Sequence, residues 1–223
     1  MTLPSKGRPS ALAWVVLCAL ATPAGAQSGL SLLDAATRGD IETVSRLARD
    51  RASIDARDSM GRTALLIATQ RDDVAMAKAL IAAGADVNAK DAISDSPYLF
   101  AAAEGRLDIL RLTLSAGADL RSLNRFGGTG LIPAAHHGHV DVVRELLKTG
   151  IAIDHVNRLG WTALLEAIVL GDGGESHTQI VQLLVAAGAD VNLGDSAGVR
   201  PLAHAERRGQ AAISGILRSA GAN

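Results

Sequence analysis

Aromatic side chains are scarce in this chain of 223 residues. Phe, Trp and Tyr together make up 2% of it, whereas hydrophobic residues as a whole make up 48%. A core therefore has to be built from Ala, Leu, Val and Ile rather than from rings. Such a core suits helices with small side chains that approach one another closely.

Thiols are scarcer still, because Cys18 is the only cysteine. It lies in an apolar run near the N-terminus and follows Val15, Val16 and Leu17, whereas a lipoprotein signal has a small residue before its cysteine. Once the N-terminal segment is removed, the chain has no thiol. This excludes disulfides, thiolate catalysis and cysteine-based zinc sites, and it suits an oxidising compartment.

An excess of charge of either sign is also missing. The chain has 22 basic and 23 acidic residues, a net charge of −1, and no block of like charge. Removal of the leader takes Lys6 and Arg8 with it, which leaves 20 basic residues against the 23 acids and a net charge of −3. We therefore expect neither nucleic acid nor an acidic membrane as a partner.

Residues 1–26 have the three parts of a secretory signal peptide. Lys6 and Arg8 form a basic start, residues 11–22 (ALAWVVLCALAT) are apolar, and Ala24-Gly25-Ala26 precedes Gln27. The alternative, a membrane anchor, needs about 20 apolar residues to span a bilayer. We expect cleavage after Ala26 and no membrane insertion of the mature chain.

The most regular feature of the chain is an internal repeat. The heptapeptide AAGADVN occurs at residues 82–88 and again at 186–192. Glycines recur at spacings of 33, 33, 38 and 33 residues, at Gly84, Gly117, Gly150, Gly188 and Gly221. A fixed period of this length is typical of a solenoid, and the longer interval indicates an insertion of five residues.

A second set of landmarks falls on the same period. Small or hydroxyl residues open apolar segments at Thr63, Ser96, Thr129 and Thr162, while Leu30 and Arg200 take that place in the first and last copies. Five residues before the last five of these openers stands an Asp or Asn, at Asp58, Asp91, Asn124, Asn157 and Asp195. The pattern predicts a turn, a short helix with an N-cap, a second helix, and a glycine in the left-handed conformation at its end. Six units result, at about 27–57, 58–90, 91–123, 124–156, 157–194 and 195–223.

One such unit cannot fold by itself. Each buried Leu, Ile or Val contributes about 1.5–3 kcal/mol, whereas ordering each residue costs about 1–2 kcal/mol. Two short helices with one apolar stripe each must therefore stack on neighbouring copies. We interpret the two AAGADVN segments as the same joint between neighbours, seen twice.

The repeat resembles the ankyrin repeat, T-P-L-H-x-A-A-x-x-G-H-x-x-I-V-x-x-L-L-x-x-G-A-D-V-N, over residues 30–223. The resemblance implies an all-α solenoid of about six helix-turn-helix units with short hairpin loops, and a function in binding another protein. The histidine of the family pattern is absent, since Leu66, Leu99, Ile132, Leu165 and Ala203 occupy its position. Residues 160–174 (GWTALLEAIVLGDGG) resemble a block of exported ankyrin proteins of Gram-negative bacteria, which implies a periplasmic location.

Catalytic motifs are missing from the sequence. It has no G-x-S-x-G, no G-x-x-x-x-G-K-[ST] and no H-E-x-x-H, so we expect no enzyme activity and no cofactor. The best metal candidate is the cluster His136, His137 and His139, but neighbouring residues do not face one another on a helix. Structural or partner-contacting histidines are the main interpretation, and a metal site is the alternative.

The remaining aromatic residues suggest a binding surface. We expect Tyr98 and Phe100 in the core. Phe126 and Trp161, with Arg125 and Arg158, lie in the predicted hairpins and form the proposed partner-binding row, because exposed rings and arginines are common in binding hot spots. The alternative is that each ring folds back on its own hairpin. Residues of the inner helices are expected to flank this row: Arg71, Glu104, His136, His137 and Val169.

These observations favour a monomeric periplasmic protein that binds another envelope protein as an accessory or stabilising partner. Two alternatives stay open: an immunity-like protein that neutralises a periplasmic effector, and a metal-binding protein that uses the histidine cluster. The insertion within residues 171–176 (GDGGES) is expected to be a longer solvated loop, with a partner contact as the alternative.

Overall fold

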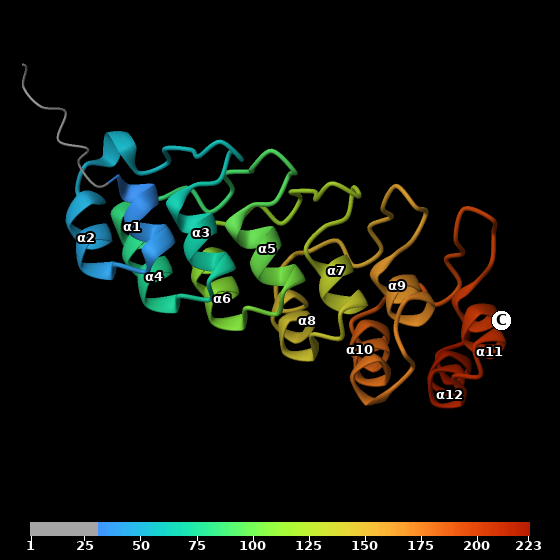
Figure 1. Cartoon of the computed structure of the whole chain (residues 1–223). Coiled ribbons are helices and arrows are strands. Elements are labelled where there is room, and N and C mark those ends of the chain that lie inside the picture. Colours follow the sequence, from blue (N-terminus) through green and yellow to red (C-terminus); the bar gives the residue numbers. More distant parts are fainter. Residues whose placement is uncertain (1–30) are drawn as a thin grey trace, which may run out of the picture.

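The computed structural model describes residues 31–223, and residues 1–26, the predicted leader, lie outside this range. Helices stack in order along the chain in two parallel rows (Figure 1). The inner row consists of α1 (Leu32–Arg38), α3 (Ala64–Gln70), α5 (Pro97–Ala103), α7 (Leu131–His136), α9 (Ala163–Val169) and α11 (Pro201–Arg207). The outer row consists of α2 (Ile41–Leu47), α4 (Val74–Ala83), α6 (Leu107–Ser115), α8 (Val140–Leu146), α10 (Glu175–Ala186) and α12 (Ala211–Ser219). A 3-10 helix, η1 (Arg51–Ser53), follows α2, and residues 31–223 contain no strand.

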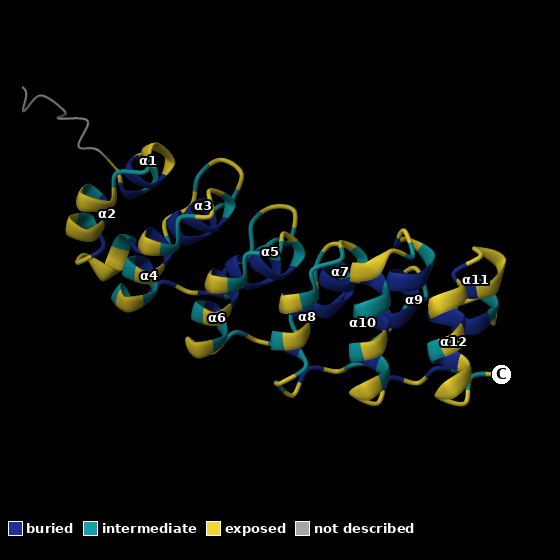
Figure 2. Cartoon of the chain, turned by 90° about the horizontal axis from the view of Figure 1, so that it is seen from below, coloured by how far each residue is buried: buried dark blue, intermediate teal, exposed yellow. Residues whose placement is uncertain are grey.

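Each helix packs on its partner and on the corresponding helix of the next pair. The buried faces point between the two rows, whereas exposed residues cover the outer helices and the loops (Figure 2). Large side chains such as Leu65, Leu80, Ile109 and Leu164 are fully buried at this seam. The all-helical solenoid predicted from the period is confirmed.

The hairpins between successive pairs, here called fingers, project to one side of the stack (Figure 1). Each finger after the first pair is closed by an Asp or Asn whose Oδ1 accepts hydrogen bonds of 2.9–3.1 Å from the backbone N–H groups two and four residues later. These residues are the predicted turn residues Asp58, Asp91, Asn124, Asn157 and Asp195. The short side chain closes each turn through hydrogen bonds to backbone groups of the same finger.

The predicted helix caps are present at three openers and absent at one. Thr63, Ser96 and Thr162 each accept a 3.2 Å hydrogen bond from the backbone N–H three residues later. At Thr129 the prediction is wrong, because the N-cap residue of α7 is Gly130 and the buried Thr129 hydroxyl has no hydrogen-bond partner among residues 31–223. In the first pair the cap is Ser31, one residue later than the period indicates, and it forms a capping box with Asp34.

The repeated AAGADVN segments make the same contacts with the following pair. Asn88 accepts from the backbone N–H of Asp119 (2.8 Å) and donates to the Gly117 carbonyl oxygen (3.3 Å). Asn192 accepts from Asn223 (3.0 Å) and donates to Gly221 (3.2 Å). The interpretation of these segments as one joint seen twice is therefore confirmed.

Four landmark glycines have φ between +86° and +98°, but Gly150 does not have a positive φ, contrary to the prediction. Thr149 instead donates to the Leu146 carbonyl oxygen (2.6 Å) at that helix end.

The five-residue insertion is not simply a solvated loop. Residues 171–174 form a loop, whereas Glu175 and Ser176 begin the 12-residue outer helix α10, on whose buried face His177 lies. The two ring nitrogens of His177 lie 2.8 Å from the His136 carbonyl oxygen and 2.7 Å from Oδ1 of Asp172. Residues 171–174 form the predicted loop and most of residues 171–176 are exposed, but His177, directly after them, contacts the neighbouring pair and anchors the segment.

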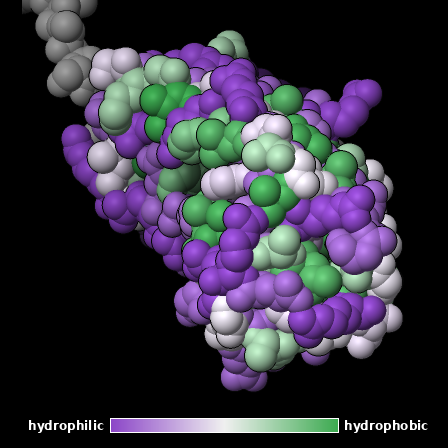
Figure 3. All heavy atoms as spheres, turned by 90° about the vertical axis from the view of Figure 1, so that its right-hand side faces the viewer, coloured by the Kyte–Doolittle hydropathy of each residue, from purple (hydrophilic) through white to green (hydrophobic). Residues whose placement is uncertain are grey.

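The stack ends at a face that mixes polar and apolar side chains. Seen from the C-terminal end, apolar side chains form several areas separated by hydrophilic ones (Figure 3). On α12, Ala211, Ala212 and Arg218 are exposed while Ile213 and Leu217 are buried against α10 and α11. A partly polar outer face lets the last pair end the stack in water. Within residues 31–223, no helix has the length and apolar character needed to cross a bilayer.

Candidate functional site: a groove between fingers and inner helices

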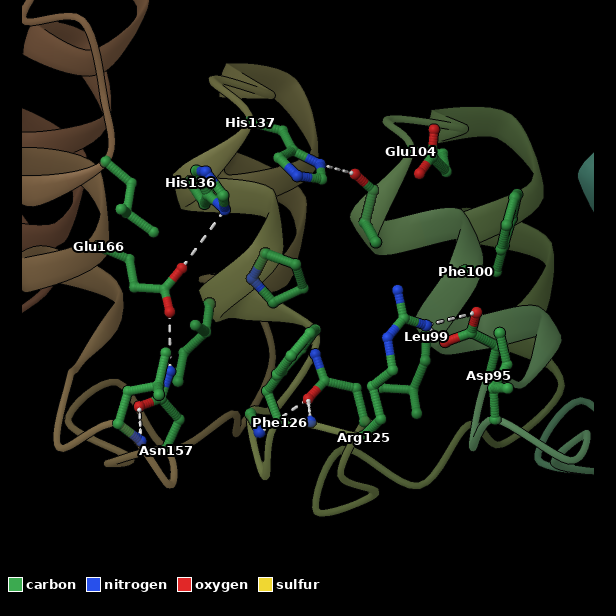
Figure 4. Close-up of a pocket in the computed structure, with 18 of the residues that line it drawn as sticks. Asp95, Leu99, Phe100, Glu104, Arg125, Phe126, His136, His137, Asn157 and Glu166 are labelled. Atoms are coloured by element: carbon green, nitrogen blue, oxygen red, sulfur yellow. Dashed lines mark hydrogen bonds and ion pairs between the residues drawn. The ribbon is translucent and has the colours of Figure 1, made fainter.

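A groove of about 520 Å³ lies where three fingers meet the inner helices α5, α7 and α9. We call it the central groove (Figure 4). From the fingers it is lined by Ile93, Asp95, Arg125, Phe126, Asn157 and Leu159. From the inner helices and their ends it is lined by Phe100, Glu104, His136, His137, Glu166 and Leu170, among others.

The wall formed by the fingers carries a row of exposed apolar side chains. Ile93 is 54% exposed, Phe126 52% and Leu159 50%, and all three stand two residues after the Asp or Asn that closes the finger. Met60 has the same place in the preceding finger and is 51% exposed. Because these four residues follow the 33-residue period, each of four successive fingers presents an exposed apolar side chain at the same position.

Arg125 is held in the groove by two contacts. Its guanidinium forms an ion pair of 3.2 Å with Asp95 on the preceding finger and lies 5.2 Å from the centre of the Phe126 ring. Burial raises the pKa of Asp95, against the opposing effect of Arg125. The ion pair therefore ties two neighbouring fingers together at the mouth of the groove.

Glu166 on α9 forms part of the groove floor. The residue is 6% exposed, its Oε1 accepts a 2.7 Å hydrogen bond from Nδ2 of Asn157, and its Oε2 lies 3.5 Å from Nδ1 of His136 (Figure 4). Burial raises the pKa of Glu166, opposed by the hydrogen bond from Asn157. Burial, together with His137 and His177, lowers the pKa of His136, so this imidazole is a weak source of positive charge for the carboxylate.

The histidine cluster is engaged with backbone oxygens. Nδ1 of His137 lies 2.6 Å and Nε2 of His139 lies 3.1 Å from the same carbonyl oxygen, that of Ala103 on α5. A carbonyl oxygen accepts hydrogen bonds, so these nitrogens carry protons rather than lone pairs for a metal. Among residues 31–223, no group of three or more His, Cys, Asp or Glu side chains is placed to hold a metal ion.

Five of the nine predicted partner-binding residues meet in the central groove: Glu104, Arg125, Phe126, His136 and His137. The others lie outside its lining. Arg158 donates to the Arg125 carbonyl oxygen (3.0 Å) on the neighbouring finger, and Arg71 donates to the Thr37 carbonyl oxygen (3.0 Å) near the N-terminal end. Val169 is half-buried on α9.

Trp161 does not stand in a row with Phe126. It is half-buried and lies four residues after its turn residue, at the position that Gly128 takes in the preceding finger. The residue equivalent to Phe126 is Leu159, which the sequence reasoning missed, although the 33-residue spacing from Met60 through Ile93 and Phe126 would have found it. Tyr98 is fully buried, as expected, whereas Phe100 is partly exposed and lines the groove.

A family model for ankyrin repeats, described as three copies, matches residues 16–91 and 99–195. The chain belongs to the ankyrin-repeat family. Ankyrin repeats indicate a module for protein–protein interaction, and the groove described above is a concave surface of the kind that such a module offers.

Solved structures show the same fold. An ankyrin-repeat domain from Acinetobacter baumannii is 54% identical, with a TM-score of 0.84 over 86% of this chain and 98% of that one. A second ankyrin-repeat protein is 43% identical, with a TM-score of 0.82 over 87% and 98%. The ankyrin-repeat domain of Bcl-3, a member of the IkappaB family, is 27% identical, with a TM-score of 0.78 over 86% of each chain. A search of curated proteins gave no match.

Proposed function

We propose that this protein is an exported, periplasmic interaction module that binds another envelope protein through the central groove. In this proposal it acts as a non-enzymatic accessory or stabilising partner. The three-part leader at residues 1–26 and the resemblance of residues 160–174 to exported ankyrin proteins support export. Membership of the ankyrin-repeat family supports a protein as the ligand.

One observation carries the choice of surface. Ile93, Phe126, Leu159 and Leu170 are all large apolar residues, all 42–54% exposed, and all line the same groove. Full burial of one such side chain contributes about 1.5–3 kcal/mol, so leaving four exposed on one surface gives up stability. Apolar side chains gathered in this way mark interaction sites on soluble proteins.

The test is photocrosslinking in intact cells. A photoreactive amino acid replaces Phe126 or Leu159 in the groove, or, as a control, the exposed Lys78 on the outer helix α4. We expect a discrete crosslinked species from the two groove positions and not from position 78. The double variant F126S/L159S, with the photoreactive group at His137, should lose that species.

The same experiment tests the location. Mass spectrometry of the protein from the periplasmic fraction should show a chain that begins at Gln27. Equal crosslinking from all three positions, or crosslinking unaffected by F126S/L159S, would contradict the groove as the binding surface. A chain that keeps residues 1–26 in the cytoplasmic fraction would contradict export.

A further inference from the structure

The charges in the central groove are unbalanced. Three carboxylates line it, those of Asp95, Glu104 and Glu166, against a single cation, Arg125. Arg125 is already paired with Asp95 at 3.2 Å. Among residues 31–223, no Lys or Arg forms an ion pair with Glu104 or Glu166, so these two carboxylates in the groove have no Lys or Arg partner in the part of the chain that the structure describes.

Glu166 is the more informative of the two because it is buried. Its side chain is 7% exposed, yet it forms part of the groove surface between the finger of Asn157 and helix α7 (Figure 4). An amide and a largely neutral imidazole replace only part of the hydration that a carboxylate loses on burial. A cation brought to this point from outside would compensate the charge that the fold leaves unbalanced.

The repeat shows that this acid is not required by the fold. The positions equivalent to Glu166 hold Asp34 in the first pair and His204 in the last. His204 lies 2.8 Å from its own finger residue Asp195, much as Glu166 contacts Asn157. In the three pairs directly before α9 the position holds Ile67, Phe100 and Pro133, which are all apolar. An apolar side chain therefore serves the stack at this position, and the carboxylate in α9 adds a charge where those copies have none. The groove around this carboxylate also has apolar walls, because Leu159, Leu170 and Phe126 line it.

We propose that the partner inserts a segment with a lysine or arginine whose cationic end reaches Glu166; this inference rests on the proposed function. The aliphatic stem of that side chain lies against Phe126 and Leu159, and apolar neighbours in the partner segment pack on Ile93 and Leu170. Lysine and arginine combine an apolar stem with a charged end, which matches an acidic floor between apolar walls. The row of exposed finger residues from Met60 to Leu159 extends beyond the groove, so it fits a polypeptide rather than a small cation.

The experiment is a selection of random twelve-residue peptides displayed on phage against the purified protein, residues 27–223. The binding of selected peptides is then measured by fluorescence anisotropy. Each peptide is compared with a matched form in which citrulline replaces arginine, or norleucine replaces lysine. Three variants are tested in parallel: E166Q, E104Q as a second groove carboxylate, and F126S/L159S, with circular dichroism to verify that each is folded.

We expect the selected peptides to be rich in Arg or Lys next to apolar residues and to bind F126S/L159S at least tenfold more weakly. Loss of the cationic group should weaken binding by about tenfold or more, as for a hydrogen bond between charged groups. In E166Q this loss should shrink to less than about threefold, and in E104Q it should stay closer to the wild-type value, because Glu104 is exposed. If E166Q fails to fold, the comparison of matched peptides on the wild-type protein still decides whether the partner segment needs a cationic group.

Two other outcomes separate the inference from the function on which it rests. Peptides that need Phe126 and Leu159 but carry no basic residue would contradict the basic segment and leave the groove as a binding site. The same holds if replacing arginine by citrulline weakens peptide binding as much on E166Q as on the wild-type protein. Peptides that bind F126S/L159S as well as wild type, or no selected peptides at all, would overturn both.

Discussion

The hydroxyl oxygen of Tyr98 lies 2.9 Å from the point at which a side chain at residue 130 would begin, and residue 130 is glycine. Tyr98 is fully buried on α5, and Gly130 is the residue before α7. The positions equivalent to Gly130 in other pairs hold Ala64, Pro97 and Ala163. Beside Gly130, the Tyr98 ring takes the space that a side chain fills at those positions. The junction between α5 and α7, which supports the central groove, therefore depends on a large residue facing one without a side chain.

This relationship predicts a coupled pair of mutations. Gly130→Ala should lower the free energy of unfolding by about 1–3 kcal/mol, because the Tyr98 side chain is enclosed and cannot move away. Tyr98→Phe should raise it by up to about 1 kcal/mol, since the hydroxyl has no hydrogen-bond partner within residues 31–223. Urea unfolding of both single variants and the double variant checks this. The two effects should not add, because a phenylalanine ring without the hydroxyl leaves room for the new methyl group; simple additivity would contradict the contact.

The joints at Asn88 and Asn192 predict unequal effects of the same change. Each asparagine makes two hydrogen bonds to the next pair, so Asn→Ala should cost about 1–2 kcal/mol locally. Asn88→Ala weakens an interior joint and should lower the global free energy of unfolding. Asn192 holds only the terminal pair, so Asn192→Ala should mainly increase amide hydrogen exchange in α11 and α12. Equal global losses from the two variants would show that the stack unfolds only as a whole.

Glu166 predicts a pH-dependent difference in stability. Burial raises its pKa above the ordinary value of 4.5, so the folded state binds the proton more tightly than the unfolded state does. The stabilisation from this proton is fully present below the unfolded pKa and is lost as pH rises through the folded pKa. Compared with E166Q, the wild-type protein should therefore lose free energy of unfolding as pH rises from about 4.5 towards neutrality.

Urea unfolding of both proteins across this range measures the difference directly. The glutamine keeps an oxygen to accept from Asn157, so the hydrogen bond is retained. His136 lies 3.5 Å from Glu166, and the charge of His137, directly after it, also lowers the pKa of Glu166. The same comparison in His136→Gln and His137→Gln backgrounds separates their contributions. A difference that stays constant with pH, or that changes in the opposite sense, would refute the assignment.

His177 predicts that the insertion is part of the packed structure. His177→Ala removes hydrogen bonds to the His136 carbonyl oxygen and to Asp172, together with a side chain that is only 11% exposed. We expect a loss of about 2–3 kcal/mol in the free energy of unfolding. Ser176→Ala, an exposed neighbour in the same helix, should change it by less than about 0.5 kcal/mol. A similarly small effect for His177→Ala would show that this residue does not anchor the insertion.

The exposed finger residues predict a separation of stability from binding. Phe126 and Leu159 are about half exposed, so F126S/L159S should change the free energy of unfolding by less than about 1 kcal/mol while it abolishes the groove crosslinks. Trp161→Ala should lower the free energy of unfolding but keep the groove crosslinks, because Trp161 is half-buried and lies outside the groove lining. Thermal unfolding and crosslinking yields for the two variants check this. Loss of the groove crosslinks from a folded Trp161→Ala variant would show that Trp161 belongs to the binding surface, as the sequence predicted.

The sequence by itself determined the repeat, the pairing of helices and the chemistry of the turns. Gly84 and Gly117, Thr63 and Ser96, and Asp58 and Asp91 act within a few residues of their own position, so a 33-residue period is enough to predict them. Interactions of this range depend on local backbone geometry, which the order of residues fixes directly.

Only the tertiary structure decided which residues share the groove and which departures from the pattern matter. Gly130 rather than Thr129 is the N-cap residue of α7, and Tyr98 of the preceding pair lies beside it, while His177 anchors the insertion through a carbonyl oxygen 41 residues earlier. Leu159 rather than Trp161 stands beside Phe126, and Glu166 is buried against a finger nine residues away. These outcomes depend on side chains from different pairs competing for one volume, and that competition is settled only when the pairs stack.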